Sequence, residues 1–409
     1  MENKIKVGLF GFGCVGKGLY DIIADDNNHP VEIVKICVKD KSKVRLISAS
    51  SFTFLKEEIL EDDAIDVVVE AINNAEEALD IVSQSLKKGK MVVSASKQMI
   101  ANNLEFLLEL QKLYGGTLLY EASSCGSIPI ISLLENYFSQ EKIFEVSGIF
   151  NGSSNYILSK ITREDLSYSE ALRLAQDLGF AEQDPVMDVG GFDAAHKLCI
   201  ISKHIFGSFL LPEHIFTQGI QCLSSADFSV AKENGFKIKL IASAGLTAEG
   251  NLKAFVLPTF VPSTHELFDI EDEYNAVVLE TQYAGRQTLK GKGAGGSPTG
   301  SAMFADIMQV RKGIHYTYPK SKTNSRSLLP NRTTFPVYLR YKQELDLDEF
   351  NLKDLKILSQ LNGEVVATAV IQVEEGNEKI FNTDKRIALI SNHLVLDSVN
   401  FNKKRLELA

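Results

Sequence analysis

One segment, residues 179–197, concentrates side chains that could move a proton and bind a charged substrate. Asp193 and Lys197 are four residues apart, so on a helix both would project from one face near its beginning. An Asp–Lys pair at this spacing is most often a surface ion pair. The adjacent glycines, the proline and the further carboxylates around it favour a functional site instead. The ionisable residues of the segment are Glu182, Asp184, Asp188, Asp193 and Lys197.

A glycine-rich loop near the amino terminus is typical of dinucleotide binding. It follows an apolar stretch at residues 4–10 and precedes an amphipathic pattern that runs through Ile23. Its first glycine permits a tight turn, its second lets the backbone approach a pyrophosphate, and its third lets helix and strand pack closely. The helix N-terminus adds N–H groups and positive partial charge for that anion. The predicted cofactor-binding residues here are Gly11, Phe12, Gly13, Cys14, Val15 and Gly16.

The choice between NAD and NADP depends on residues 38–41, which end the second predicted strand. An acidic residue there favours the ribose hydroxyls of NAD, whereas a basic residue could hold the 2′-phosphate of NADP. Lys39 and Lys41 flank Asp40. The signal is mixed, solvated charges at a strand end would look the same, and the two lysines tip the balance toward NADP, with Lys39 as the predicted contact.

A dinucleotide loop beside a lysine and carboxylates suggests hydride chemistry. Oxidation of an alcohol releases a hydride and a proton, and no metal-ligand spacing is visible, so a side chain must handle the proton. A lysine whose pKa is lowered by partial burial could do so, while carboxylates bind a substrate ammonium.

Composition limits the class of protein. The chain has 409 residues, of which 44% are hydrophobic and 23% are charged. This length and composition predict two or three globular domains. A net charge of −10 without a basic run makes nucleic acid an improbable partner. The five cysteines form no Cys-x-x-Cys pair and the seven histidines do not cluster with them, which argues against disulfides and zinc. No apolar stretch approaches the ~20 residues that span a bilayer, and no signal peptide is visible. A cytoplasmic protein is expected.

Strand and helix patterns alternate through the first third of the chain, which predicts an α/β fold with a parallel, Rossmann-like sheet. Predicted strands lie at 4–10, 31–38, 65–71 and 91–94, with a helix at 75–88. The pattern of predicted elements then becomes that of an α+β region, with strands at 145–150 and 237–243 and helices at 128–137, 169–178 and 194–206. Residues 316–336 resemble a linker, and the remainder is strand-rich, with strands at 337–341 and 365–373.

Seven motifs in register resemble the homoserine dehydrogenase family across residues 4–315. They are the glycine loop, Ser94-Ala-Ser-Lys97, Glu121-Ala-Ser, Ile128-Pro-Ile, Asn151-Gly-Ser-Ser-Asn-Tyr156, the acidic segment, and Gly293-Ala-Gly-Gly-Ser-Pro-Thr299. The resemblance implies NAD(P)H-dependent, reversible reduction of L-aspartate-4-semialdehyde to L-homoserine, on the route to threonine and methionine.

The resemblance also implies roles for individual residues. Lys197 is similar to the general acid/base and Asp193 to its partner, and Lys97 resembles a lysine near both nicotinamide and substrate. Glu182, Asp188 and Ser153 match substrate ligands. Ser94, Gly179 and Gly293 match positions near the cofactor. A sodium site is implied from Glu121 and the carbonyls of Ser124, Gly126 and Ile128, which are suitable ligands for a hard cation.

The sequence departs from the family pattern at three places. Ser124-Cys125 stands where an apolar and a glycine-like residue are usual, Ser96 replaces a frequent asparagine, and Asn73-Asn74 replaces common glycines. Many relatives carry an ACT regulatory domain at the carboxyl terminus, but no ligand-binding glycine motif is recognisable here.

The expected organisation is an NAD(P)-binding domain at 1–128 with a returning helix at about 297–315, a substrate and dimerisation domain at 129–296, and an accessory unit at 336–409. A homodimer or higher homo-oligomer is expected. Two other functions stay open. A cysteine-dependent aldehyde dehydrogenase would use Cys125 as nucleophile, although no histidine is identifiably placed to activate it. A non-catalytic NAD(P)-binding regulator would leave the segment at 179–197 without a purpose.

Overall fold

The computed structural model describes residues 4–26, 30–45, 47–247, 250–318, 333–347, 350–361, 363–373 and 387–394. The chain divides into two compact units, each treated by itself below. The first comprises residues 1–140, 203–209 and 291–321, and the second comprises 141–202, 210–290 and 322–409. Within the described ranges, no helix combines the length and apolar character needed to cross a membrane.

The first unit is built on a six-stranded parallel sheet with the order β3-β2-β1-β4-β5-β6. The chain leaves β1 toward β2 and later returns to its other side as β4, so the strand order reverses at the carboxyl ends of β1 and β4, where α/β sheets bind ligands. The strands are β1 (Ile5–Phe10), β2 (Val31–Cys37), β3 (Phe52–Thr53), β4 (Val67–Glu70), β5 (Met91–Ser94) and β6 (Thr117–Leu119).

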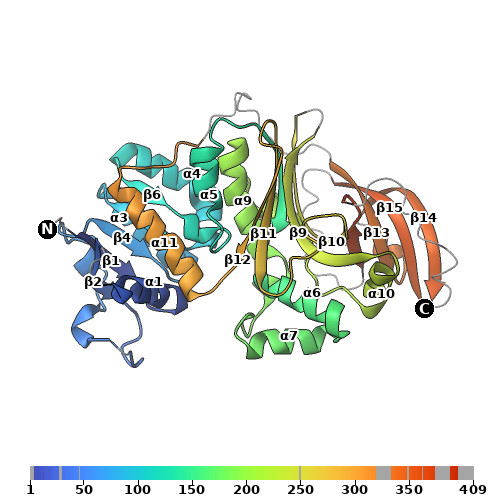
Figure 1. The fold of residues 1–409 in the computed structure, drawn as a ribbon, viewed down its shortest axis with the longest axis horizontal. Coiled ribbons are helices and arrows are strands. Elements are labelled where there is room, and N and C mark those ends of the chain that lie inside the picture. The colour runs from blue at the N-terminus through green and yellow to red at the C-terminus, as the bar shows by residue number, and fades with distance from the viewer. Residues whose placement is uncertain are drawn as a thin grey trace. The chain divides into compact units, whose positions relative to one another are not determined.

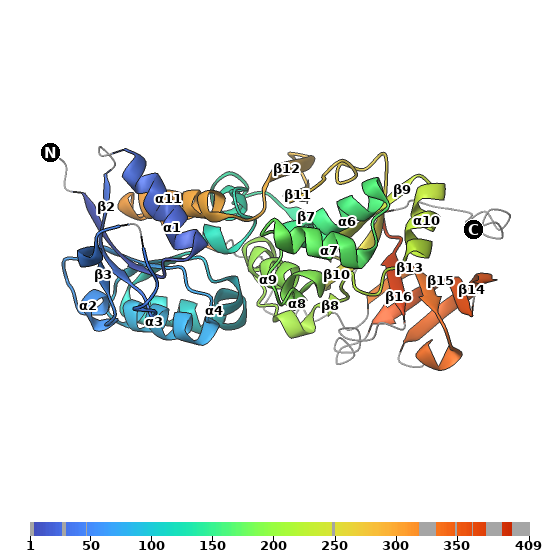
Figure 2. The same ribbon diagram turned by 90° about the horizontal axis from the view of Figure 1, so that it is seen from below.

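Helices cover both faces of this sheet. Figure 2 shows α1 (Cys14–Asp25) and α11 (Gly296–Arg311) on one face, with α3 (Ala75–Lys87) and α4 (Lys97–Tyr114) on the other. The short helix α2 (Glu57–Leu60) precedes β4. Helices α1 and α11 approach closely because both carry glycine at the contact: a Cβ on Gly18 would lie 2.1 Å from the carbonyl oxygen of Gly296. The late helix therefore packs on the amino-terminal fold.

The second unit contains a mixed, ten-stranded sheet with the order β12-β11-β7-β9-β10-β16-β13-β15-β14, while β8 pairs with β10 (Figure 1). Its first strands are β7 (Ile143–Ile149), β8 (Phe216–Thr217), β9 (Phe236–Leu246), β10 (Leu252–Pro262), β11 (Tyr274–Thr281) and β12 (Arg286–Lys292). Its helices are α6 (Gly152–Glu164), α7 (Tyr168–Asp177), α8 (Val186–Val189), α9 (Phe192–Phe206), whose last turn belongs to the first unit, and α10 (Ser225–Glu233).

Strands from the carboxyl-terminal region continue this sheet. They are β13 (Thr333–Tyr341), β14 (Asn351–Leu361), β15 (Glu364–Val373) and β16 (Ala388–Ser391). One apolar cluster joins Phe216 and Phe255 to Val337 and Leu339, so these strands share a core with β8 and β10. Most of the linker expected at 316–336 lies outside the described residues.

The predicted fold class is confirmed: a parallel Rossmann-like sheet is followed by a mixed α+β region. One predicted helix differs. Residues 128–137 form a single α turn, α5 (Ile130–Ser132), which continues as a π-helical turn (Leu133–Tyr137) closed by a bond from the Phe138 N–H to the Leu133 carbonyl of 2.8 Å. Between the strands, 3₁₀ turns occur at Ala49–Ser51, Glu121–Ser123, Pro212–His214 and Glu344–Leu347.

Candidate active site

An ion pair at the beginning of α9 is the centre of the candidate site in the second unit. Lys197 Nζ lies 2.8 Å from Asp193 Oδ2, and the two residues are only 5% and 2% exposed. Gly191 ends the preceding turn with a φ of 84° and accepts the first helical bond from the Ala195 N–H. A carboxylate in the first turn of a helix is stabilised by the free N–H groups there. The helix thus favours a negative Asp193, which in turn holds the lysine ammonium.

Lys197 is held from a second side by backbone. Its Nζ donates to the Phe150 carbonyl at 2.7 Å, and the same oxygen accepts from Asn275 Nδ2 at 3.1 Å. An ammonium group has three N–H donors. Within the described residues, contacts to Asp193 and Phe150 use two of them.

Asn151 connects two of the four carboxylates of the segment, those of Asp188 and Asp193. Its Nδ2 donates to Asp188 Oδ1 at 2.7 Å and to Asp193 Oδ2 at 3.0 Å, while its Oδ1 accepts from the Ser154 N–H as the N-cap of α6. Sequence reasoning included this asparagine in a motif but gave it no role. The available signal was an asparagine directly before a helix, the usual position of an N-cap.

Ser153 and Glu182, predicted to bind substrate, and Gly179, predicted to lie near the cofactor, are found in the first turn of α6 and in the segment after α7. Gly179 adopts a φ of 76° after α7, and the Phe180 N–H returns to the Ala175 carbonyl at 2.8 Å, which closes the helix end. Ser153 Oγ donates to the Phe180 carbonyl at 2.5 Å and so ties α6 to this turn. Glu182 is exposed. The structure therefore connects Ser153 with the turn at residues 179–180, whereas the Glu182 carboxylate lies at the surface.

The glycine loop of the first unit has the backbone that its sequence predicts. Gly11 has a φ of 93°, and a Cβ there would lie 2.4 Å from the Ala71 carbonyl; a Cβ on Gly16 would lie 2.2 Å from the Gly11 carbonyl. Gly13 differs, because a Cβ there would meet no atom within 4 Å. No side chain caps the N-terminus of α1 at Gly13. The loop therefore offers open space and helix N–H groups, including those of the predicted Cys14 and Val15, to an anionic group.

The carboxyl ends of β4 and β5 hold a buried acid that sequence reasoning did not single out. Glu70 is fully buried and accepts from Ser94 Oγ at 2.5 Å and from the Ile72 N–H at 2.7 Å. Burial raises the pKa of Glu70 to about 7. Its only sequence signal is an acid that ends an apolar strand. Lys97 is the first residue of α4, three residues after Ser94.

Lys39, the predicted contact for the 2′-phosphate, lies just beyond β2. Its Nζ pairs with Glu77 Oε2 at 2.6 Å, and the lysine side chain is 78% exposed. A pair of exposed charges holds its partners weakly. The lysine can therefore exchange Glu77 for another anion at little cost.

The predicted sodium loop packs against residues 291–293. The Ser127 N–H donates to the Lys292 carbonyl at 3.0 Å, and a Cβ on Gly126 would lie 2.6 Å from the Gly293 carbonyl. The Glu121 carboxylate is buried and accepts from the Ile131 and Ser132 N–H groups. Across the described ranges, no group of three His, Cys, Asp or Glu side chains could hold a metal ion.

The other two predicted ligands of this loop, Ser124 and Ile128, are also buried. The Ile128 carbonyl already accepts from the Ile130 N–H at 2.8 Å. A cation here would thus depend mainly on backbone oxygens and on Glu121. Cys125 in the same loop is completely buried, and a buried thiol is poorly placed to attack a substrate.

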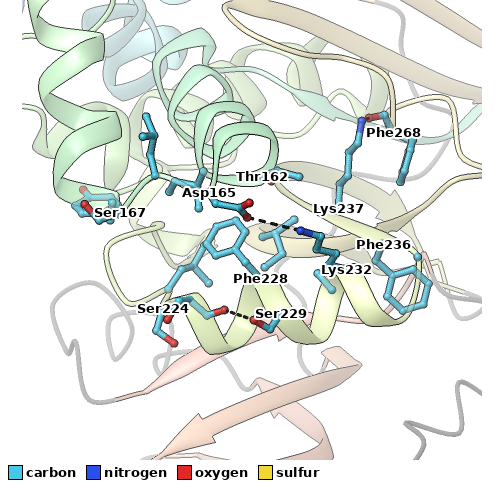
Figure 3. A pocket seen from close by; sticks show the side chains of 18 residues that line it. Thr162, Asp165, Ser167, Ser224, Phe228, Ser229, Lys232, Phe236, Lys237 and Phe268 are labelled. Carbon is cyan, nitrogen blue, oxygen red and sulfur yellow. Dashed lines mark hydrogen bonds and ion pairs between the residues drawn. The ribbon is translucent and has the colours of Figure 1, made fainter. Parts of the chain in front are cut away.

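A pocket of about 550 Å³ in the second unit lies elsewhere (Figure 3). It opens between the end of α6 and helix α10, with Phe228 on its floor and Asp165 facing Lys232 across it. Ser167 and Ser224 on its wall are already engaged as helix caps. None of the predicted site residues lines this pocket, so its shape does not mark the candidate active site.

Comparisons with known proteins agree with both halves of this description. A family model described as homoserine dehydrogenase matches residues 129–308, and one described as the homoserine dehydrogenase NAD binding domain matches residues 11–121. Homoserine dehydrogenase of Lactococcus lactis is 34% identical over 319 residues, which are 75% of this chain and 74% of that protein.

Solved structures give the same result. The crystal structure of a homoserine dehydrogenase from Thiobacillus denitrificans matches with a TM-score of 0.80 at 27% identity, over 95% of this chain and 98% of the other. A hyperthermophilic archaeal homoserine dehydrogenase in complex with NADPH matches with a TM-score of 0.66 at 26% identity, over 76% of this chain and 99% of the other. The chain belongs to the homoserine dehydrogenase family of oxidoreductases, and its first unit is a nicotinamide-dinucleotide-binding domain.

Proposed function

We propose that this protein catalyses the reversible, NAD(P)H-dependent reduction of L-aspartate-4-semialdehyde to L-homoserine in threonine and methionine biosynthesis. The observation that carries the proposal is the buried Lys197–Asp193 pair, with Lys197 also bound to the Phe150 carbonyl. An N–H of this ammonium is proposed to donate to the oxygen that changes between carbonyl and hydroxyl.

Lys197 is the proposed general acid in reduction and general base in oxidation. When bound, the nicotinamide supplies the hydride to the aldehyde carbon. Lys197 gives its proton to the carbonyl oxygen, so that one hydride and one proton convert the aldehyde to the alcohol. Asp193 stabilises the ammonium before the transfer, and the Phe150 carbonyl fixes its direction. Lys97 is proposed as a further catalytic residue.

The substrate ammonium is proposed to bind to carboxylates of the acidic segment. Asp188 is half-buried and oriented by Asn151, which supports a preformed acceptor. Glu182 is exposed and would close on the substrate from the surface. Ser153 is proposed to contact the substrate from the first turn of α6, and Gly179 to lie near the cofactor.

The cofactor phosphates are proposed to bind at residues 11–16, where the open position at Gly13 supports a close approach. Ser94 and Gly293 are proposed to contact the nicotinamide end. We further propose a preference for NADP, supported by Lys39, whose exposed pair with Glu77 can yield to a 2′-phosphate. The dissociation constants of NADPH and NADH for the wild type and Lys39→Ala test this. The variant should raise the dissociation constant of NADPH about tenfold and leave that of NADH almost unchanged, as expected for loss of a charge-assisted hydrogen bond.

A sodium ion is proposed at Glu121 and the carbonyls of Ser124, Gly126 and Ile128. Two neighbouring buried carboxylates, those of Glu121 and Asp306, support this site. The Glu121 backbone N–H donates to Asp306 Oδ2 at 2.9 Å, and burial raises the pKa of both acids. A cation would offset the cost of burying these charges. The melting temperature in sodium chloride should exceed that in choline chloride at equal ionic strength.

A homodimer or higher homo-oligomer is also proposed. β12 and β14 form the edges of the described part of the second sheet, and exposed strand edges can pair with another copy. Sedimentation velocity would measure the assembly.

The decisive experiment is the rate of NAD(P) reduction with L-homoserine. Turnover that needs homoserine supports the proposed function. Cofactor binding without turnover of homoserine or aspartate semialdehyde would overturn it in favour of a regulator, and a trapped thioester on Cys125 would favour an aldehyde dehydrogenase.

A further inference from the structure

Glu70 is a buried acid at the point where three loops of the first unit meet. It ends β4, whose neighbours in the sheet are β1 and β5. Parallel strands point their carboxyl ends to one edge, so the loops after β1, β4 and β5 leave the sheet together at the strand-order reversal. Glu70 is completely buried at this edge.

Each carboxylate oxygen of Glu70 holds a different loop. Oε1 accepts from the Ile72 N–H at 2.7 Å, within the loop that leads to α3. Oε2 accepts from Ser94 Oγ at 2.5 Å, and Ser94 Oγ in turn accepts from the Ser96 N–H at 3.1 Å. The segment held in this second way delivers Lys97 as the first residue of α4.

The same acid also supports the glycine loop through its neighbour. The Ala71 N–H donates to the Phe10 carbonyl at 2.9 Å, and the Ala71 carbonyl is the atom that a side chain at Gly11 would strike, at 2.4 Å. A shift of residues 71–72 would therefore move the wall against which Gly11 turns. Loops 11–16, 71–74 and 94–97 are thus linked through one carboxylate.

Glu70 is a costly means of joining loops. Within the part of the chain that the structure describes, its carboxylate accepts from a hydroxyl and from a backbone N–H, and burial raises its pKa to about 7. Between the ordinary carboxyl pKa and about 7, the folded protein retains a proton that the unfolded chain has released. Stability therefore falls as the pH rises through this window. A neutral side chain of the same shape would avoid this cost, so stability alone does not explain an acid here.

We propose that Glu70 is a positioning residue of the dinucleotide site, which holds residues 71–74 and 94–97 together and thereby sets the affinity for the nicotinamide end of the cofactor. Glutamine cannot replace it fully, because its amide has one acceptor oxygen where the carboxylate has two. With one oxygen left on the Ile72 N–H, the amide group faces Ser94 as a donor, and the hydroxyl loses its acceptor. The inference rests on the proposed function only in that a nicotinamide cofactor binds at this edge.

The test compares Glu70→Gln and Glu70→Asp with the wild type, with NADPH as the probe. Fluorescence titration gives the NADPH dissociation constant, and thermal unfolding at pH 8 gives stability. We expect each variant to raise the dissociation constant about tenfold, and Glu70→Gln to melt at or above the wild-type temperature. Ser85→Ala is the matched control, because Ser85 is a buried serine of the same unit whose hydroxyl donates to the Ile81 carbonyl within α3.

An unchanged dissociation constant in Glu70→Gln would overturn the proposal, as would a lowered melting temperature with affinity intact, which is the mark of a structural role. If Glu70→Gln does not fold, Glu70→Asp decides the matter, since its shorter side chain keeps the carboxylate but cannot reach both the Ile72 N–H and Ser94 Oγ. Homoserine oxidation by the wild type is measured in parallel. Its absence, with NADPH binding still dependent on Glu70, would refute the proposed reaction and not this inference.

Discussion

Two buried carboxylates, one in each unit, differ in what surrounds them. Asp193 lies against a lysine ammonium at 2.8 Å and an asparagine amide at 3.0 Å, in the first turn of a helix. Glu70 lies at a strand end and, among the described residues, accepts from the Ser94 hydroxyl and the Ile72 N–H. The first is paired with a titratable cation, Lys197, whereas the second accepts from a hydroxyl and a backbone N–H.

This difference separates proton transfer from positioning. A buried charge that is paired with a titratable cation can support acid–base chemistry, because the cation can lose its proton while the partner stays in place. A buried acid that joins loops mainly fixes geometry, and its removal should change affinity before it changes the chemical step. The predictions below test this division, beginning with the largest effect.

Lys197→Ala should lower kcat by about 100- to 10,000-fold, the range for loss of a general acid–base group. The loss of folding stability should be limited, because Asn151 still donates a hydrogen bond to Asp193 in this variant. Steady-state homoserine oxidation measures the effect. Lys203→Ala is the control, since Lys203 is a buried lysine of the same helix that bonds to the Gly207 carbonyl. Near-normal kcat in Lys197→Ala would remove Lys197 from the chemistry.

Asn151→Ala should lower kcat by about 10- to 100-fold, because a misplaced acid–base pair loses its alignment with the substrate. It should also lower the free energy of unfolding by about 1 kcal/mol through loss of the N-cap of α6. Ser167→Ala removes the N-cap of α7 instead and should cost similar stability without loss of turnover. Equal turnover in the two variants would show that Asn151 is only a cap.

Glu182→Gln should raise the KM for homoserine about tenfold while kcat changes little. A carboxylate that binds an ammonium forms a charge-assisted hydrogen bond, but the exposure of Glu182 reduces its value. Initial rates over a range of homoserine concentrations give both constants. Asp184→Asn changes another exposed carboxylate two residues away and should have no such effect. If both variants behave alike, Glu182 is a surface charge.

Cys125→Ser should have the smallest effect, with kcat within about threefold of the wild type, because hydride transfer needs no covalent intermediate. Steady-state turnover and thermal unfolding should be measured together, since the thiol is fully buried. Loss of turnover in a folded variant would revive the aldehyde dehydrogenase alternative.

The sequence predicted most of the first unit because its signals are local. The glycine loop, the apolar strands and the helix at Ala75–Lys87 each depend on a short pattern. The strand order was not predicted, because right-handed crossovers are compatible with more than one order. The carboxyl-terminal strands were predicted as elements, but their shared core with Phe216 and Phe255 was not. Contacts over such distances in the chain leave no periodic signal.

The site shows the same division. The spacing of Asp193 and Lys197 was enough to place both on one helix face, as observed. The Phe150 carbonyl could not be predicted, because backbone groups carry no sequence signature. Asn151 and Glu70 could be seen in the sequence, but their partners could not be predicted. Asp188 and Asp193 lie 37 and 42 residues after Asn151, and Ser94 lies 24 residues after Glu70.

The division between proton transfer and positioning is tested most directly by measuring two quantities on the same two variants. For Lys197→Ala and Glu70→Gln, single-turnover rates at saturating NADP and homoserine report the chemical step, and fluorescence titration reports the NADPH dissociation constant. Lys197→Ala should slow the chemical step at least 100-fold and leave NADPH affinity unchanged. Glu70→Gln should raise the NADPH dissociation constant about tenfold and leave the single-turnover rate at saturating NADP and homoserine within about threefold of the wild type. Loss of the same quantity in both variants, or an unchanged chemical step in Lys197→Ala, would contradict the account.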